Sequence, residues 1–196
     1  MNGGIPLFER FLGPDFAALP PEVQAGHAVD RQLQLAGRAR VIRGGGLWPR
    51  LIAFLFRFPK ATDDIPVTVT MTAQDGGELW ERRFGDSRFW SFLKVHNGVM
   101  TERFAPFTFT LGLHVADGQL HYPVKSGRLG PLPLPNFLLP ISNAREFTRD
   151  GQFHFDVQLL APLTGGLMVH YQGRLSRLSD GDQKRIERPE TVKVAE

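Results

Sequence analysis

Two histidines and one aspartate are spaced so that paired strands would bring them to one face of a sheet. In residues 151–175, His154, Asp156 and His170 alternate with apolar side chains, and a break at residues 162–166 separates two alternating runs. Alternation with a period of two is typical of strands that have one apolar and one polar face. A histidine oriented by a carboxylate is the smallest unit of general base catalysis. We therefore take these three side chains as candidates for acid–base catalysis.

The expected turn near Gly165 determines which polar side chains are neighbours. Pairing of the two runs about this turn places Asp156 near Gln172 and His154 near Arg174. Three interpretations of this polar face remain open: the solvated outside of the sheet, the lining of a polar-edged pocket, or a catalytic site. Cross-strand polar pairs are common on the outer face of antiparallel sheets. Under the pocket interpretation, Arg174 is a candidate ligand-binding residue.

Other catalytic and metal-binding patterns are missing from the sequence. The chain has no cysteine, which excludes disulfides, thiolate metal sites and a cysteine nucleophile. No serine lies in a Gly-x-Ser-x-Gly motif, and the histidines lack the His-x-x-x-His and His-Glu-x-x-His spacings. The three glycines at residues 44–46 lack the spacing and the lysine of phosphate-binding loops. We therefore predict neither a metal site nor a cofactor.

The alternation that presents these side chains extends over most of the chain. Gln32–Arg43 alternates, and from Pro66 onward short turns separate successive runs of period two. Asp-Gly and Asn-Gly pairs between apolar runs are strong signals of hairpins, because both residues tolerate positive φ. These pairs are Asp75-Gly76, Asn97-Gly98, Asp117-Gly118 and Asp150-Gly151. The sequence thus predicts an antiparallel meander without the long crossovers of parallel sheets.

We predict a mainly β fold within an α+β framework: a strongly curved antiparallel sheet or β-barrel of about ten strands, since sheets of that size rarely stay open and flat. N-terminal helices between Ile5 and Ala25 and one apolar helix at residues 47–58 are expected to pack on it. The prolines of residues 127–140 argue against a central strand and favour a short helix at residues 135–139.

Residues 1–178 are expected to form a single domain. The remaining residues, 179–196, are charged and lack apolar periodicity, so we predict a disordered tail there.

Aromatic residues are abundant enough to fill a core or to line a cavity. The chain has 16 phenylalanines, and the helix predicted at residues 47–58 is apolar around almost its whole circumference, apart from Arg50 and Arg57. This helix is either buried between the sheet and the N-terminal helices, or a lid over an apolar cavity, or a surface element with both arginines toward lipid headgroups. The candidate ligand-binding residues of such a cavity are Trp48, Phe54, Trp80, Trp90, Phe107, Phe109 and Arg174.

The charge pattern and the hydropathy restrict the partners. The formal net charge is +3, with basic residues spread along the chain, so we expect no nucleic-acid binding. The N-terminus lacks the features of a signal peptide, and no apolar run reaches the roughly 18 residues of a spanning helix. We therefore expect a cytoplasmic protein, with association at a membrane surface as the alternative.

The order of several motifs resembles a bacterial family of domains of unknown function. Those motifs are LFERFLGPDFAALPPEV, ARVIRGGGLWPRLIAFLFRFP, VTVTMTAQDGGELWERRFG and GQFHFDVQLLAPLTGGLMVHYQGRL, and the resemblance covers residues 7–178. That family is similar to domains found alone or behind saccharopine-dehydrogenase-like NAD(P)-binding domains. The resemblance implies a bacterial origin and an uncharacterised activity, and it supplies no catalytic residues. This chain lacks the dinucleotide-binding half, so no redox function transfers to it.

Three functions follow as hypotheses. The first, which we favour, is a binding module for an apolar or amphipathic small molecule or a lipid, because curved sheets closed by a helix commonly enclose such ligands. The second is an acid–base enzyme that uses His154, Asp156 and His170 in a pocket. The third is a domain that docks on a membrane or a protein and acts beside a separate reductase.

Overall fold

Tight turns join the strands of the computed structural model, which describes residues 4–178. Both residues have positive φ angles in each of the turns Asp75-Gly76, Asn97-Gly98, Asp117-Gly118 and Asp150-Gly151. These are the dihedral angles of type I′ turns, whose twist matches that of paired antiparallel strands. The predicted antiparallel arrangement is confirmed.

The strands are β1 Gln32–Arg43, β2 Thr62–Gln74, β3 Gly77–Phe84, β4 Ser87–His96, β5 Val99–Phe104, β6 Phe107–Leu111, β7 His114–Ala116, β8 Gln119–His121, β9 Val124–Leu129, β10 Leu132–Pro133, β11 Ile141–Arg149, β12 Gln152–Leu160 and β13 Leu167–Arg177. The helices are α1 Leu7–Leu12, the 3-10 helix η1 Gly13–Ala18, α2 Pro21–Gly26, α3 Leu47–Leu55 and the 3-10 helix η2 Asn136–Leu138. Among the described residues, none of these helices has the length and the apolar run that crossing a bilayer requires.

The first and last strands meet at the centre of the sheet. The strand order is β10-β9-β6-β5-β4-β3-β2-β1-β13-β12-β11-β8-β7, and every pair is antiparallel. The register predicted for the last hairpin is confirmed, because Asp156 pairs with Gln172 and His154 pairs with Arg174. Phe153 and Phe155 of β12 are buried. The apolar face of this hairpin is therefore the inner face, and His154 and Asp156 lie on the outer one.

The sheet of the described residues has thirteen strands and is not closed, so neither the barrel nor the count of about ten is confirmed. Residues 107–116 and 119–129 each form two strands instead of one, with the divisions at Gly112 and at Pro123. Proline removes a backbone donor, and glycine permits a bend. The hairpin of residues 107–129 consequently pairs with β5 near its base and, through β8, with β11 near its tip. The two margins of the sheet are joined by this one bent hairpin and not by a continuous ladder.

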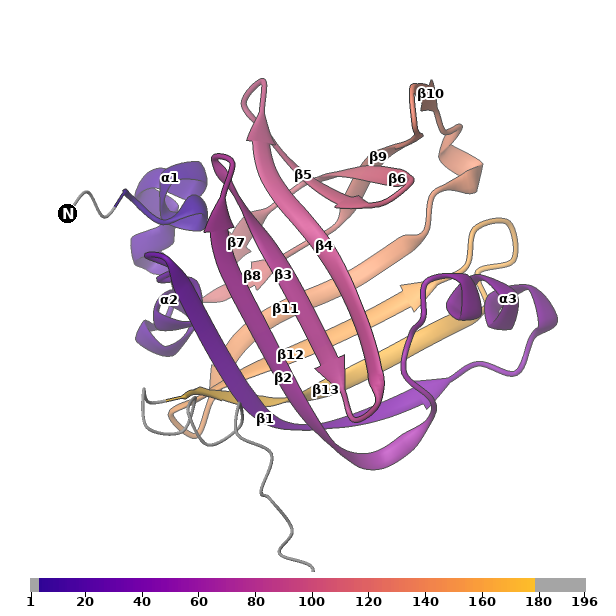
Figure 1. Cartoon of the computed structure of the whole chain (residues 1–196), viewed down its shortest axis with the longest axis horizontal. Helices are drawn as coiled ribbons and strands as arrows, with labels where there is room; N and C mark the ends of the chain where they lie inside the picture. The colour runs from indigo at the N-terminus through magenta and orange to yellow at the C-terminus, as the bar shows by residue number, and fades with distance from the viewer. Residues whose placement is uncertain (1–3, 179–196) are drawn as a thin grey trace, which may run out of the picture.

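The sheet curls strongly enough for its inner face to contact itself. Phe84 of β3 and Tyr171 of β13 are separated by two strands in the sheet, yet their ring centroids are 5.1 Å apart. Figure 1 shows β2, β3 and β4 in front of β11, β12 and β13, with the interior between them. The N-terminal helices lie at one end of this interior and α3 lies at the other. The predicted helical N-terminus is confirmed, whereas α3 ends at Leu55, before the expected boundary at Phe58. The tail predicted at residues 179–196 lies outside the described residues.

Candidate functional site

The curled sheet surrounds a cavity of about 430 Å³. This volume lies within the range of roughly 300–1,000 Å³ that small-molecule sites occupy. Its wall is mainly apolar and aromatic, because period-two alternation places one side chain in two from each strand on the inner face. Wall residues come from opposite sides of the curl and include Met71, Phe84, Phe104, Phe109, Phe155 and Tyr171.

The two ends of the cavity differ. Phe8 of α1 is fully buried, and its ring is stacked on His27 with the centroids 4.0 Å apart, so the N-terminal helices close this end. At the other end Trp48, Leu55 and Leu129 both line the cavity and are exposed. The cavity therefore reaches solvent beside α3.

His27, Tyr122 and Glu146 form a hydrogen-bonded group in the cavity wall. The Tyr122 hydroxyl donates to Glu146 Oε2 at 2.6 Å, and His27 Nε2 lies 2.5 Å from the same oxygen. The Tyr122 hydroxyl is 3.2 Å from His27 Nε2. Burial holds the pKa of Tyr122 well above its usual value, and the neighbouring Glu146 adds to this rise. The hydroxyl thus stays protonated and remains a donor at neutral pH.

His27 itself is 1 % exposed, and its Nδ1 atom has no hydrogen-bond partner within residues 4–178. A buried polar atom without a partner is costly. His27 Nδ1 is thus an unsatisfied buried polar atom of the described chain.

A second polar group in the wall contains Arg82, Ser91 and Glu102. Arg82 donates to Ser91 Oγ at 2.7 Å and to Glu102 Oε1 at 3.1 Å, and the Ser91 hydroxyl donates to that same carboxylate oxygen at 2.7 Å. The Arg82 and Glu102 side chains are each 14 % exposed. The guanidinium carbon lies 4.7 Å from the centre of the Trp80 ring, a cation–π contact.

A third carboxylate is buried beside these groups. Glu78 is 2 % exposed, accepts a hydrogen bond from the Trp80 indole nitrogen at 2.8 Å through Oε2, and has no partner for Oε1 within the described residues. Burial raises the pKa of Glu78 above its ordinary value, and the Trp80 hydrogen bond offsets part of this rise. Removal from water disfavours the charged form of a carboxylate more than one hydrogen bond restores it.

The charges of the wall are largely compensated. Arg82 pairs with Glu102, and Arg145, which borders the cavity, pairs with Asp156 at 3.1 Å. Among the described residues the wall thus offers no unpaired cation for an anionic ligand group. It offers the Tyr122 hydroxyl and the Arg82 guanidinium, which can exchange hydrogen bonds with a neutral polar group. No three histidine, aspartate or glutamate side chains of residues 4–178 are arranged to hold a metal ion.

The structure brings four of the candidate ligand-binding residues to the cavity. Trp48, Trp80, Phe107 and Phe109 all line it. The remaining candidates lie elsewhere, and the reason is the face on which each side chain falls. Phe54 points away from the sheet on α3 and is 77 % exposed.

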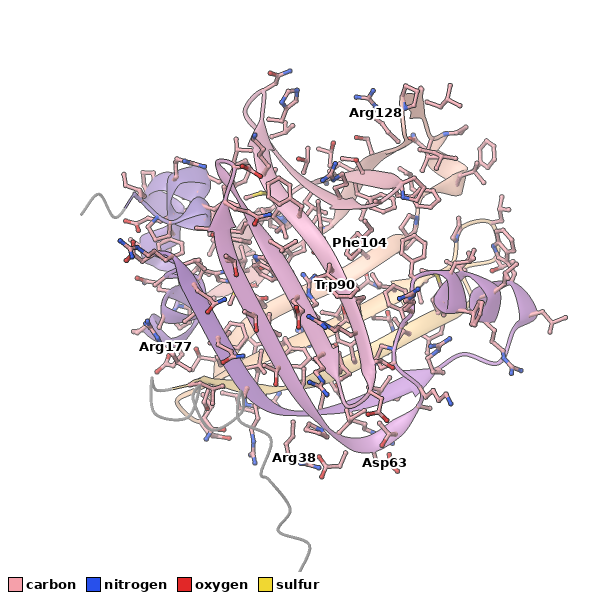
Figure 2. The ribbon with its side chains drawn as sticks, in the orientation of Figure 1. Arg38, Asp63, Trp90, Phe104, Arg128 and Arg177 are labelled. Atoms are coloured by element: carbon pink, nitrogen blue, oxygen red, sulfur yellow. The ribbon has the colours of Figure 1, made fainter. Side chains whose placement is uncertain are left out.

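Trp90 and Arg174 belong to the outer face of the sheet. Trp90 is exposed on β4 (Figure 2), beneath the Arg88 guanidinium, and its indole nitrogen donates to Glu81 at 3.2 Å. Arg174 is exposed on β13 and pairs in register with His154. Neither side chain borders the cavity.

The acid–base candidates also lie on the outer face. His170 Nε2 is 2.7 Å from Asp156 Oδ1, so these two side chains do meet. His154 is not in this pair, because its ring stacks on Phe147 with the centroids 5.6 Å apart. Asp156 and His170 line an open depression of the outer face together with His114, His121 and Arg145, and of these five residues only Arg145 also borders the interior cavity.

The polar residues of the cavity were not singled out in the sequence, although a signal for two of them is present. Arg82 lies between Trp80 and Phe84, and Glu102 between Met100 and Phe104, so each is a charged residue at an inward position of an alternating run. His27 and Glu146 have no such signal, because 119 residues separate them and only the fold brings them together.

Comparison with known proteins places the whole site within one family. No curated protein matches the chain. A family model described as Domain of unknown function (DUF4166) matches residues 19–175, a range that includes both polar groups of the cavity and its whole apolar wall. The chain therefore belongs to the DUF4166 family of domains of unknown function.

Proposed function

We propose that the protein binds a small amphipathic molecule inside the curled sheet. The observation that carries this proposal is a cavity of about 430 Å³ whose apolar wall contains two hydrogen-bonded polar groups. Small-molecule sites typically combine such a wall with a few polar side chains that fix the orientation of the ligand. A fold that needed only a stable core would bury apolar residues at Arg82 and Glu102, because buried ion pairs are seldom more stable than apolar substitutes.

The ligand is best matched by an uncharged polar head on an apolar body. Arg82 is neutralised by Glu102, while Glu146 adds a further carboxylate at the closed end. A carboxylate placed there would meet carboxylates without an unpaired cation, which is unfavourable in a water-poor cavity. A hydroxyl or carbonyl group, in contrast, can use the hydrogen-bonding capacity of Tyr122 and Arg82.

A competition experiment tests this proposal. N-phenyl-1-naphthylamine, a neutral apolar fluorophore, is bound to the protein and displaced by 1-dodecanol or by dodecanoate, which have the same chain length and differ in the head. We expect the alcohol to displace the probe at a lower concentration than the carboxylate at neutral pH. Absence of probe binding, or preference for the carboxylate, would contradict the proposal.

Acid–base catalysis in the same cavity is a second candidate, favoured by one observation. A phenol and an imidazole contact the same oxygen of Glu146, at 2.6 and 2.5 Å, inside an enclosed apolar site. Such a group can take a proton from a bound molecule and return it at another atom. The test is conversion of a bound ligand, followed by mass spectrometry, in the wild type and in Tyr122→Phe. Equal conversion in both proteins, or none in the wild type, argues against it.

A further inference from the structure

Exposed apolar side chains are concentrated around the open end of the cavity. Apart from Ile5, Trp90 and Val99, every large apolar side chain that is exposed within residues 4–178 belongs to α3, to residues 129–141 or to the β12–β13 loop. We call these side chains the apolar collar. Its members are Leu47, Trp48, Leu51, Phe54, Leu55, Leu129, Leu132, Phe137, Ile141 and Leu163.

The three segments of the collar are held together around one opening. The Trp48 indole nitrogen donates to the Pro162 carbonyl oxygen at 3.0 Å, which joins α3 to the β12–β13 loop. Ala53 of α3 packs with Ala161 and Met168 in a small buried cluster. All three segments contribute to the cavity wall, and Figure 1 shows α3 and β10 at the same side of the molecule. The collar is thus a continuation of the cavity onto the surface.

The apolar side chains of the collar are unusually exposed to solvent. Leu47 is 85 % exposed and Phe54 is 77 % exposed, on a helix that is apolar on nearly every side. Soluble proteins rarely expose contiguous apolar patches unless something binds to them. We therefore expect the collar to bind an apolar partner that lies outside the described residues.

The charges of the collar segments identify the kind of partner. Residues 42–61 and 126–141 contain cations and no aspartate or glutamate, and residues 159–168 contain no charged residue. The exposed cations are Arg50, Arg57, Lys60 and Arg128, the last of which lies beside β10 in Figure 2. The nearest acidic residues along the chain, Asp63 and Asp64, accept hydrogen bonds from Arg40 and Arg38 of β1. Apolar side chains among unopposed cations are the pattern of segments that bind to anionic lipid surfaces.

We propose that the apolar collar docks on the surface of an anionic lipid bilayer, so that the cavity opens toward the membrane. The evidence for docking is the exposed apolar collar and the cations beside it. Exchange of a ligand between the cavity and the bilayer rests in addition on the binding function proposed above. Docking beside α3 would let an apolar molecule pass between the cavity and the bilayer without crossing water, which is the transfer that costs most free energy.

Flotation with vesicles tests the docking. The full chain is mixed with vesicles of phosphatidylcholine, with or without phosphatidylserine. We expect association with the anionic vesicles that weakens as salt is added, because screening reduces the attraction of surface charges. The double variant Leu47→Asp/Phe54→Asp should lose association. Val99→Asp is the matched control, since Val99 is an exposed apolar residue outside the collar, and it should associate as the wild type does.

The cationic part of the collar has its own variant. Arg50→Gln should weaken association with anionic vesicles about fivefold, the factor expected for one cation near such a surface. Arg177→Gln is the matched control, because Arg177 is an exposed cation at the far side of the molecule from α3 (Figure 2), and it should leave association unchanged. All these side chains are exposed, so circular dichroism and the unfolding midpoint should match those of the wild type.

The docking proposal would be overturned if the wild type did not associate with vesicles, or if the collar variants and their controls lost association equally. It would also be overturned if the wild type formed a dimer in solution that Leu47→Asp/Phe54→Asp dissociates, while the wild type did not associate with vesicles. Failure of the binding function gives a different result. In that case the wild type associates with vesicles, but N-phenyl-1-naphthylamine does not bind in solution. If both proposals hold, the collar variant binds this probe in solution with wild-type affinity and no longer associates with vesicles.

Discussion

The ion pair of Arg82 and Glu102 gives the sharpest test of how the cavity wall is built. Both side chains are 14 % exposed, and they share Ser91 as a hydrogen-bond partner. Removal of one member of a buried pair leaves the other charge without compensation, which costs about 3–5 kcal/mol. The remaining exposure of both side chains favours the lower end of that range. We therefore expect Arg82→Met and Glu102→Gln each to lower the free energy of unfolding by about 3 kcal/mol.

The double variant separates charge compensation from simple loss of contacts. In Arg82→Met/Glu102→Gln no unpaired charge remains, so the loss should be no larger than that of one single variant. The coupling free energy is then at least about 3 kcal/mol. Urea unfolding, followed by tryptophan fluorescence, measures all four proteins. In a domain of this size each single variant should lower Tm by roughly 6–12 °C.

The same double variant tests the role of the pair in recognition. It should still bind N-phenyl-1-naphthylamine, which needs only the apolar wall. Its affinity for 1-dodecanol should fall about tenfold, because a hydrogen bond to a charged group contributes roughly 1.5 kcal/mol. Additive losses of stability, near 6 kcal/mol in the double variant, would refute the reasoning, as would single variants as stable as the wild type.

Three further outcomes follow from the cavity and its surroundings. Burial raises the pKa of Tyr171 to about 12 and that of Tyr122 above its ordinary value, so neither of the two tyrosines should show tyrosinate absorbance near pH 10 until the protein unfolds. Because only the unfolded chain releases these protons, the free energy of unfolding should fall as pH rises above about 10. Because the pKa of Glu78 is raised in the folded state, the folded protein keeps the Glu78 proton to higher pH than the unfolded chain does, and the stability of the wild type should decrease as pH rises above about 4.5. Glu78→Gln should remove this decrease, and identical pH profiles of the wild type and the variant in urea unfolding would contradict the prediction. Ala144→Phe should fill space in the cavity and abolish binding of the fluorescent probe with little change in the urea midpoint, and retained binding would place the ligand elsewhere.

Local chemistry made much of the fold predictable from the sequence. Asp-Gly and Asn-Gly pairs fixed the turns through their tolerance of positive φ, and alternation placed Phe153 and Phe155 on the same face. The hairpin register followed from the turn near Gly165 and agrees with the pairing of His154 with Arg174. These features depend on neighbours within a few residues of one another, so a single sequence contains them.

The closure of the sheet depends on contacts that no local pattern encodes. Gly112 and Pro123 bend a long hairpin so that its tip pairs with β11, and this hairpin joins the two margins of a sheet that is not closed by a continuous ladder. The same bend carries Tyr122 to His27, 95 residues earlier in the chain. Residue type and spacing indicate His154, Asp156 and His170 as acid–base candidates, but spacing alone does not tell the inner face of a hairpin from the outer one.

Methionine methyl NMR tests the central claim, an amphipathic ligand inside the curl, most directly. Met71 and Met168 line the cavity, whereas Met100 is fully buried outside the wall and serves as an internal control. Titration with 1-dodecanol should produce saturable shifts of the Met71 and Met168 methyl signals while the Met100 signal stays in place. Unchanged signals of Met71 and Met168 at saturating alcohol, or equal shifts of all three methyl groups, would contradict the account.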